Sequence, residues 1–471
     1  MSVIPPPPQT RSERLSRWVA SIRFDDLPHA VVEHTCLRIL DVFGLVLAGR
    51  GTPFGRSVCE AVLALNPAGS ARIFGRGEAT TVPGAAFANG ALSQALEFDD
   101  THNESIVHMS SPAVAAAFAL ADSAPISGRD LITAIAVGNE ISCRVGSVAP
   151  GQFHRRGFHP TGLFATFGAT WLAARMLGLT AGQMTNAAGI AGSFASGLLQ
   201  CWVDGTQSKF LHPGWAAQSG IVAATLGKSG TTGPTAVLEG RFGLFAAHLQ
   251  DETVARNFDR VTEGLGTHWE SENASFKPFP VAHVIHPYID ALLRLRAQHG
   301  IDPDQVERIH CPVAGYIVGI VCEPTAEKRR PRSDSHGRVS LQYTLAEALV
   351  HGRMDKNAYQ PASLGDPRIL RIADRVEYAV DPTYPGPERF KGAIEIVMKD
   401  GTSYQTVEEN NRGSAANPMS VEEIVGKFDA NAADILGASA RHALADAVMA
   451  LPKASEAGLV VDLTIGSGAA A

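Results

Sequence analysis

Up to about residue 265, the sequence is a succession of apolar segments rich in alanine and glycine, whose hydrophobic residues recur with helical periodicity. The segment 30–48 ends in a glycine followed by a proline, which is a helix stop signal, and its apolar stripe contains Val31, Leu37, Leu40 and Leu47. Similar segments lie at 82–96, 112–121, 130–145, 161–177 and 215–226. Because small side chains let helix axes approach closely, the pattern predicts a tightly packed helical body.

The sequence changes character near Glu270, and strand signals appear from there to Glu409. Two alternating stretches, 393–398 and 402–407, flank an Asp-Gly dipeptide, and this combination predicts a β-hairpin. We also expect a strand at 305–313 and helices at 340–351 and 369–376.

Helical patterns return after Asn410. Ser420 and Glu423 have the spacing of a capping box, and a further helix is expected at 440–449. We therefore predict a mainly α protein with a large all-helical domain built from both chain ends, residues 1–270 and 410–471. A smaller α+β domain, residues 271–409, is inserted between them.

Composition excludes several classes of protein. Of the 471 residues, 45% are hydrophobic and only 18% are charged, which excludes intrinsic disorder and indicates a large core or a surface covered by a partner subunit. A net charge of −7 disfavours nucleic-acid binding. The six cysteines form no C-x-x-C pair, which predicts reduced thiols and a cytoplasmic protein. The start, MSVIPPPPQTRSERLSRW, has no secretory h-region, and no apolar run reaches the ~20 residues of a membrane span.

The densest polar cluster is the acidic segment 97–104, Glu-Phe-Asp-Asp-Thr-His-Asn-Glu, with His108 downstream. It could be a solvated loop, a Mg²⁺ site, or a loop that supplies acid–base groups and orients a substrate. The Mg²⁺ alternative is similar to the acidic motif of class I terpenoid synthases, but the second motif of those enzymes is not found and aromatic residues make up only 7%.

Three further segments could carry chemistry. The segment 154–162 contains His159 and Arg156 just before an apolar helix, which favours anion binding, although a capping or surface role is the alternative. Lys209 lies in an uncharged stretch and could be a base or an electrostatic clamp, or a lysine that extends to solvent. Lys277 and His283 lie in a proline-stiffened segment at the expected domain junction.

Two other patterns carry no function in our interpretation. The basic run 328–332 is expected to be a solvated loop. No Walker motif or Rossmann glycine fingerprint is found, so a nucleotide cofactor is not indicated.

Six stretches, in order from about residue 30 to 430, together resemble the MmgE/PrpD family. They are EFDDTH with His108 downstream, GFHPTG, GTQSKFLHPGWAAQSG, FKPFPVAH, SLQYTLAEAL and NPMSVEEIVGKF. The resemblance implies an all-helical domain from both termini, an α+β lid, a homodimer, and no metal or organic cofactor.

The resemblance also implies which residues form the site. The expected catalytic residues are His108, His159, Lys209, Lys277 and His283. The acidic segment is expected to bind the substrate through Glu97, Asp100 and Thr101, and we add Arg156 from the residues themselves. Many family members have aspartate where this chain has Glu97, a difference that could alter acid–base geometry or substrate preference.

The function implied is a bond-making or bond-breaking step beside a carboxylate of a small di- or tricarboxylate. Cations would hold the carboxylates, a histidine or lysine would remove a proton, and His108 is a candidate for the acid. We favour a lyase of the dehydratase type. Decarboxylation and epimerisation could use the same groups, and a helical dimer that binds an acid without catalysis is the alternative outside enzymology.

Overall fold

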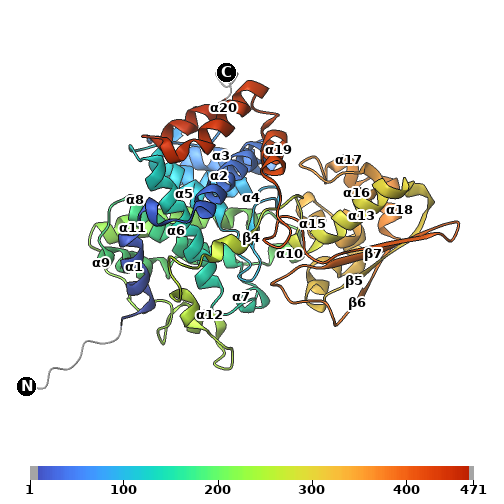
Figure 1. Ribbon diagram of the computed structural model, residues 1–471, viewed down its shortest axis with the longest axis horizontal. Helices are drawn as coiled ribbons and strands as arrows, with labels where there is room; N and C mark the ends of the chain where they lie inside the picture. Colours follow the sequence, from blue (N-terminus) through green and yellow to red (C-terminus); the bar gives the residue numbers. More distant parts are fainter. Residues whose placement is uncertain (1–8, 466–471) are drawn as a thin grey trace, which may run out of the picture.

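The computed structural model describes residues 9–465 and is mainly helical, with 56% helix and 9% strand, which confirms the expected class. A larger helical part lies beside a smaller part that contains the longest strands (Figure 1). None of the helices in the described range is long and apolar enough to cross a membrane.

Helices follow one another through the first part of the chain, as the periodicity predicts. The longer ones are α1 (Arg11–Ser21), α2 (His29–Arg50), α3 (Pro53–Leu65), α4 (Val82–Gln94), α5 (Ser110–Ala121), α6 (Gly128–Gly146), α8 (Thr166–Met176), α9 (Ala181–Ala191) and α11 (His212–Lys228). Shorter ones are α7 (Gln152–Arg155), α10 (Cys201–Asp204) and α12 (Leu244–Leu249). After the middle segment, residues 271–409, the chain returns to this part as α19 (Val421–Ala432) and α20 (Ala438–Met449) (Figure 1).

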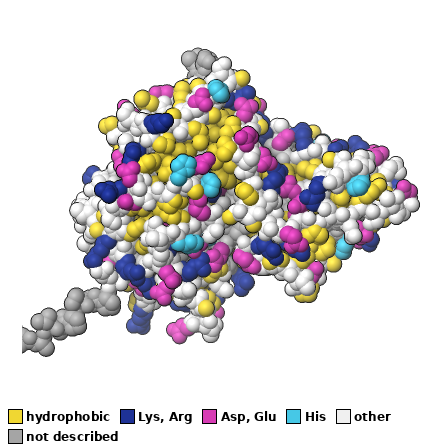
Figure 2. Space-filling view, viewed as in Figure 1, with side chains coloured by type: hydrophobic (Ala, Val, Ile, Leu, Met, Phe, Trp, Pro, Cys, Tyr) yellow, Lys and Arg dark blue, Asp and Glu magenta, His cyan; other side chains and the backbone are white. Residues whose placement is uncertain are grey.

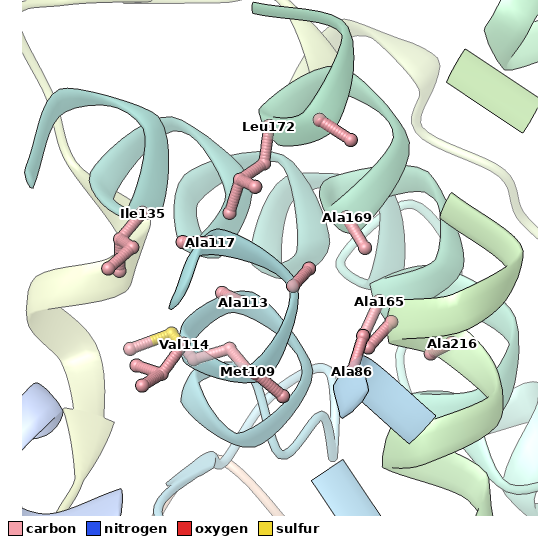
Figure 3. Packing of buried hydrophobic residues seen from close by; sticks show 14 of the residues in the cluster. Ala86, Met109, Ala113, Val114, Ala117, Ile135, Ala165, Ala169, Leu172 and Ala216 are labelled. Atoms are coloured by element: carbon pink, nitrogen blue, oxygen red, sulfur yellow. The ribbon is translucent and has the colours of Figure 1, made fainter. Parts of the chain in front are cut away.

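Small residues allow these helices to pack closely. A Cβ atom added to Gly214 of α11 would lie 2.2 Å from the carbonyl oxygen of Phe87 in α4, and one added to Gly168 of α8 would lie 2.2 Å from that of Gly138 in α6. Alanines fill the same region, and Figure 3 shows Ala86, Ala165, Ala169 and Ala216. The alanine and glycine content therefore serves helix contact, as predicted.

The middle segment contains a four-stranded sheet in the order β6-β5-β7-β8. Its strands are β5 (Val306–Val313), β6 (Val376–Val380), β7 (Gly392–Met398) and β8 (Ser403–Glu408). The predicted hairpin is β7–β8, an antiparallel pair whose turn has Gly401 at φ +88°. The accompanying helices are α13 (His286–His299), α14 (Thr325–Arg329), α15 (Asp334–Gly337), α16 (Leu341–His351), α17 (Pro361–Leu364) and α18 (Pro367–Ala373).

Buried apolar side chains form two large clusters. One extends from Leu15 to Ala274 and continues from Phe428 to Val461, so both chain ends contribute to it. The other extends from Phe279 to Ile396 and lies within the middle segment. The domain limits at 270 and 409 stay predictions.

The helix expected at 369–376 is too long at its C-terminal end. Helix α18 ends at Ala373, and Val376 begins β6, which pairs in parallel with β5. Strand β6 was not predicted because its partner, β5, lies more than sixty residues earlier in the chain.

The interpretation of the basic run 328–332 as a solvated loop is wrong for its first two residues, which form the end of α14, and the first of them is also buried. Lys328 is 3% exposed, and its ammonium group donates to the carbonyl oxygens of Ile320 at 2.8 Å and Val339 at 2.7 Å. Two backbone acceptors thus replace the water that a buried lysine loses.

Candidate active site

A cavity of about 240 Å³ lies between the helical body and the middle segment. At ~30 Å³ per water molecule this is room for about eight waters, the size of a small organic acid. Most of the site residues expected from the sequence line it, namely Glu97, Thr101, His108, His159, Lys209, Lys277 and His283.

The acidic loop, residues 96–101, follows α4 and is joined to the middle segment by a short pairing of strands. Strand β3 (Thr101–His102) pairs antiparallel with β4 (Ala274–Ser275). This pairing brings Lys277 beside Glu97, although 180 positions separate them in the chain.

Backbone carbonyls of the acidic loop are held by side chains from distant elements. Glu97 has φ +54°, a left-handed conformation that costs a non-glycine residue of order 1–3 kcal/mol. Such a conformation persists when its surroundings determine it, and here four buried donors do so. They are Arg338 to Leu96 O (2.9 Å), Lys277 to Glu97 O (3.1 Å), Lys427 to Phe98 O (2.9 Å) and His108 Nδ1 to Asp100 O (2.8 Å).

The carboxylate of Glu97 links two buried lysines. Its Oε1 accepts a hydrogen bond from Lys209 Nζ and lies 3.4 Å from Lys277 Nζ. Burial raises the pKa of Glu97, but the two lysines outweigh burial and hold it well below its usual range. Burial lowers the pKa of Lys277, which makes its ammonium group a better proton donor than an exposed lysine.

The hydrogen bonds of His108 define its tautomer. Its Nδ1 donates to the carbonyl oxygen of Asp100, so Nε2 of the neutral ring carries a lone pair. That Nε2 lies 3.9 Å from Glu97 Oε1. Burial and the neighbouring lysines hold the pKa of His108 well below its usual range, so the ring is neutral at pH 7.

His159 lies next to His108, with ring centroids 5.6 Å apart. Its Nδ1 is 2.9 Å from Nδ1 of His212, and its buried Nε2 has no hydrogen-bond partner among residues 9–465. Burial and Lys209 hold the pKa of His159 well below its usual range. It precedes a π-helical turn, Thr161–Ala165, a geometry that is frequent at functional sites.

His283 comes from the middle segment and packs against the ring of Phe390, with centroids 5.0 Å apart. Asn411 Nδ2 donates to its Nε2 at 2.9 Å. Its buried Nδ1 has no hydrogen-bond partner within the described range. Burial lowers the pKa of His283 well below its usual range.

Asp99 belongs to the acidic loop, and its side chain is fully buried. Ser111 Oγ donates to its Oδ2 at 3.0 Å, and its Oδ1 lies 3.4 Å from Nδ1 of His108. Burial raises the pKa of Asp99 to about 7, although Lys277 opposes the shift. Burial thus favours the protonated form of this carboxyl at a higher pH than in an exposed aspartate.

Two expected substrate-binding residues do not line the cavity, which corrects the sequence prediction. Asp100 is buried, with Oδ2 2.7 Å from Arg38 Nη1 and 2.5 Å from Ser110 Oγ, so it supports the loop from behind. Arg156 turns toward Asp251, 3.2 Å away. Its neighbour Arg155 lines the cavity instead.

Several residues of the site were missed by sequence reasoning. Arg38 and Lys427 are buried cations that support the acidic loop, and each stands in a helix with many apolar positions. Arg38 and Asp41 are the charged residues within an otherwise apolar stretch of α2, and this is a signal that could have found Arg38. Asn411 carries no such signal, since only the fold brings it to His283.

The arrangement offers two ammonium groups, two neighbouring neutral imidazoles and one carboxylate. Among residues 9–465, no group of three or more His, Cys, Asp or Glu side chains has an arrangement that could hold a metal ion. Lysine ammonium groups can bind carboxylates, and neutral imidazoles can accept and pass on protons.

Sequence comparisons define the class of protein. The model of the MmgE/PrpD N-terminal domain matches residues 13–257, and that of the MmgE/PrpD C-terminal domain matches residues 279–452. The chain belongs to the MmgE/PrpD family, which confirms the resemblance inferred from six short stretches.

Curated relatives are similar over most of their length. A cis-aconitate decarboxylase of Aspergillus terreus is 25% identical over 475 residues, 96% of this chain and 95% of the relative. The cis-aconitate decarboxylase of Mus musculus is 27% identical, over 90% of this chain and 87% of the relative. The 2-methylcitrate dehydratase of Escherichia coli is 25% identical, over 74% of this chain and 75% of the relative.

Proposed function

We propose that this protein is a lyase that acts on a small di- or tricarboxylate through a carbanion formed beside a carboxylate. The observation that carries the proposal is the buried group Lys209–Glu97–Lys277 beside the neutral rings of His108 and His159. Membership of the MmgE/PrpD family, whose relatives include dehydratases and decarboxylases, supports it.

For dehydration, we propose His108 as the base, in place of the acid expected from the sequence, and the hydrogen bond from its Nδ1 to Asp100 O supports this role. Its Nε2 lone pair would take the proton from the carbon beside a carboxylate, while Lys209 and Lys277 stabilise the negative charge. The electron pair of the C–H bond forms the new double bond and the C–O bond breaks. The hydroxyl group takes up a proton and leaves as water. Lys277 is suited to supply that proton because burial lowers its pKa.

Decarboxylation is the second candidate, and the extent of similarity favours it. The decarboxylases above align over 90–96% of this chain, whereas the dehydratase aligns over 74%. In this reaction the bond to a carboxylate breaks, carbon dioxide leaves, and a lysine ammonium group protonates the carbon that receives the electron pair.

The decisive experiment follows cis-aconitate, citrate, 2-methylcitrate, malate and 3-butylmalate with the protein in D₂O by NMR, so that tricarboxylates and dicarboxylates with and without an alkyl group are all represented. Loss of water supports dehydration, release of carbon dioxide supports decarboxylation, and deuterium uptake without net reaction supports epimerisation. If none of these acids changes, the lyase proposal is refuted and binding without catalysis is favoured.

A matched pair of variants tests the site itself. Lys209→Met removes a buried ammonium group, and we expect the turnover number to fall about 10²–10³-fold, as for loss of one transition-state donor. Lys228→Met removes an exposed lysine of α11 and should leave turnover unchanged. Near-full activity of Lys209→Met with an intact fold would show that the assignment is wrong.

We also propose that the middle segment is a lid and that the protein works as a homodimer without metal. The cavity between the two parts supports the lid. The low charged share of 18%, with hydrophobic side chains gathered over the large part in Figure 2, supports a partner subunit. Light scattering on the purified protein tests the dimer.

A further inference from the structure

The cavity has two chemically different sides. One side carries the charged and imidazole groups, Lys209 and His108 from the helical body and Lys277 and His283 from the start of the middle segment. The rest of the middle segment contributes a mostly apolar side, made by Val284, Tyr316, Ile320, Pro387 and Phe390. Trp202 of α10 extends this apolar side, with its ring centroid 5.8 Å from Lys209 Nζ.

The positive charge that faces the cavity is limited. Lys209 and Lys277 share the carboxylate of Glu97, so these three groups carry one net positive charge. Arg155, an exposed residue at the cavity wall, adds a second. These two positive charges would balance the negative charges of two ligand carboxylates. A third would have to lie against the apolar side, where a carboxylate loses its hydration without gaining a cation.

We propose that the natural substrate is an amphipathic dicarboxylate, with an alkyl or similar apolar substituent that lies against the side formed by Val284, Ile320 and Phe390. This inference rests on the proposed function, because it assumes that Lys209 and Lys277 hold the substrate carboxylates. It narrows the substrate class from small di- or tricarboxylates in general to dicarboxylates with an apolar group.

Saturated acids test the inference by binding alone, since they cannot eliminate water or lose carbon dioxide readily. Calorimetry would compare methylsuccinate, butylsuccinate and the tricarboxylate tricarballylate. Each buried methylene strengthens binding about fourfold, so the three added methylenes of butylsuccinate should lower its Kd about sixtyfold relative to methylsuccinate. Tricarballylate should bind more weakly than methylsuccinate.

The variant Ile320→Thr, with Val318→Thr as its control, locates the apolar side. Ile320 lines the cavity and is half-buried, whereas Val318 lies two residues earlier, is also half-buried and does not line it. Ile320→Thr should reduce the advantage of butylsuccinate about fivefold and leave the Kd of methylsuccinate unchanged. Val318→Thr should change neither.

The outcomes separate this inference from the proposed function. Tighter binding of tricarballylate than of butylsuccinate, or an unchanged advantage in Ile320→Thr, overturns the substrate class and leaves the lyase proposal standing. A clear alkyl advantage without turnover of any acid in the NMR panel supports the binding inference and refutes the lyase. Binding of none of the three acids overturns the inference as well.

Discussion

Replacement of Glu97 by glutamine tests the electrostatic design of the site. Glutamine keeps the shape of the side chain but removes the charge that Lys209 and Lys277 share, and all three side chains are more than nine-tenths buried. Breaking a buried ion pair by removing one partner costs about 3–5 kcal/mol, so we expect Glu97→Gln to lower the free energy of unfolding by that amount at pH 7.5. The measurement is urea unfolding followed by tryptophan fluorescence.

The stability difference between wild type and Glu97→Gln should depend on pH, and its direction follows from the pKa of Glu97. The folded-state pKa of Glu97 is depressed, so its stabilisation is complete above the unfolded value of ~4.3 and is lost as the pH falls below it. The difference between wild type and variant should therefore shrink in acid.

Two further proteins serve as controls. Glu422→Gln, at an exposed position in the first turn of α19, should change stability by at most about 1 kcal/mol. The double variant Glu97→Gln/Lys277→Met should recover part of the loss, because one unpaired ammonium group is gone. A loss in Glu97→Gln no larger than in Glu422→Gln would refute the reasoning.

Three other outcomes are expected. Burial raises the pKa of Asp99 to about 7, so the wild type loses stability as the pH rises from about 4 to 7. In thermal unfolding, Asp99→Asn should therefore be as stable as wild type near pH 4. At pH 8 it should be more stable, by at most about 4 kcal/mol. Lys427→Met removes the ion-pair partner of Asp41, 2.8 Å away, and the hydrogen-bond donor to the carbonyl of Phe98, so both stability and turnover should fall. The double variant Asp41→Asn/Lys427→Met should regain stability but not turnover. Treatment with EDTA should leave turnover unchanged because lysine charges perform the electrostatic role; recovery on adding Mg²⁺ after a loss would contradict this.

Seven of the nine predicted site residues line the cavity, and they could be found because they stand in short, distinctive stretches; their roles stay predictions. Lys209 is a lone charge among uncharged residues. Lys277 follows the expected domain junction and directly precedes two closely spaced prolines, Pro278 and Pro280. The role of His108 could not be read in this way. Its tautomer depends on the carbonyl of Asp100, and the loop conformation that presents this carbonyl depends on donors from elsewhere in the chain.

The errors have a common physical cause. Asp100 and Arg156 are adjacent in the chain to Thr101 and Arg155, which line the cavity. Their own side chains contact partners outside the cavity, Arg38 and Asp251 respectively. Lys328 is buried because two carbonyls of the middle segment accept its hydrogen bonds. Charge alone predicts solvent exposure, and only the fold supplies such partners.

The sequence by itself determined the local elements. The capping box of Ser420 and Glu423 forms as predicted at the start of α19, and the Asp-Gly turn joins β7 to β8, because these interactions span only a few residues. The tertiary structure decided which charges meet. Glu97, Lys209 and Lys277 form one buried group only because β3 pairs with β4 and closely packed helices exclude water around them. In that dry environment the charges must neutralise one another, and this long-range requirement cannot be read from neighbouring residues.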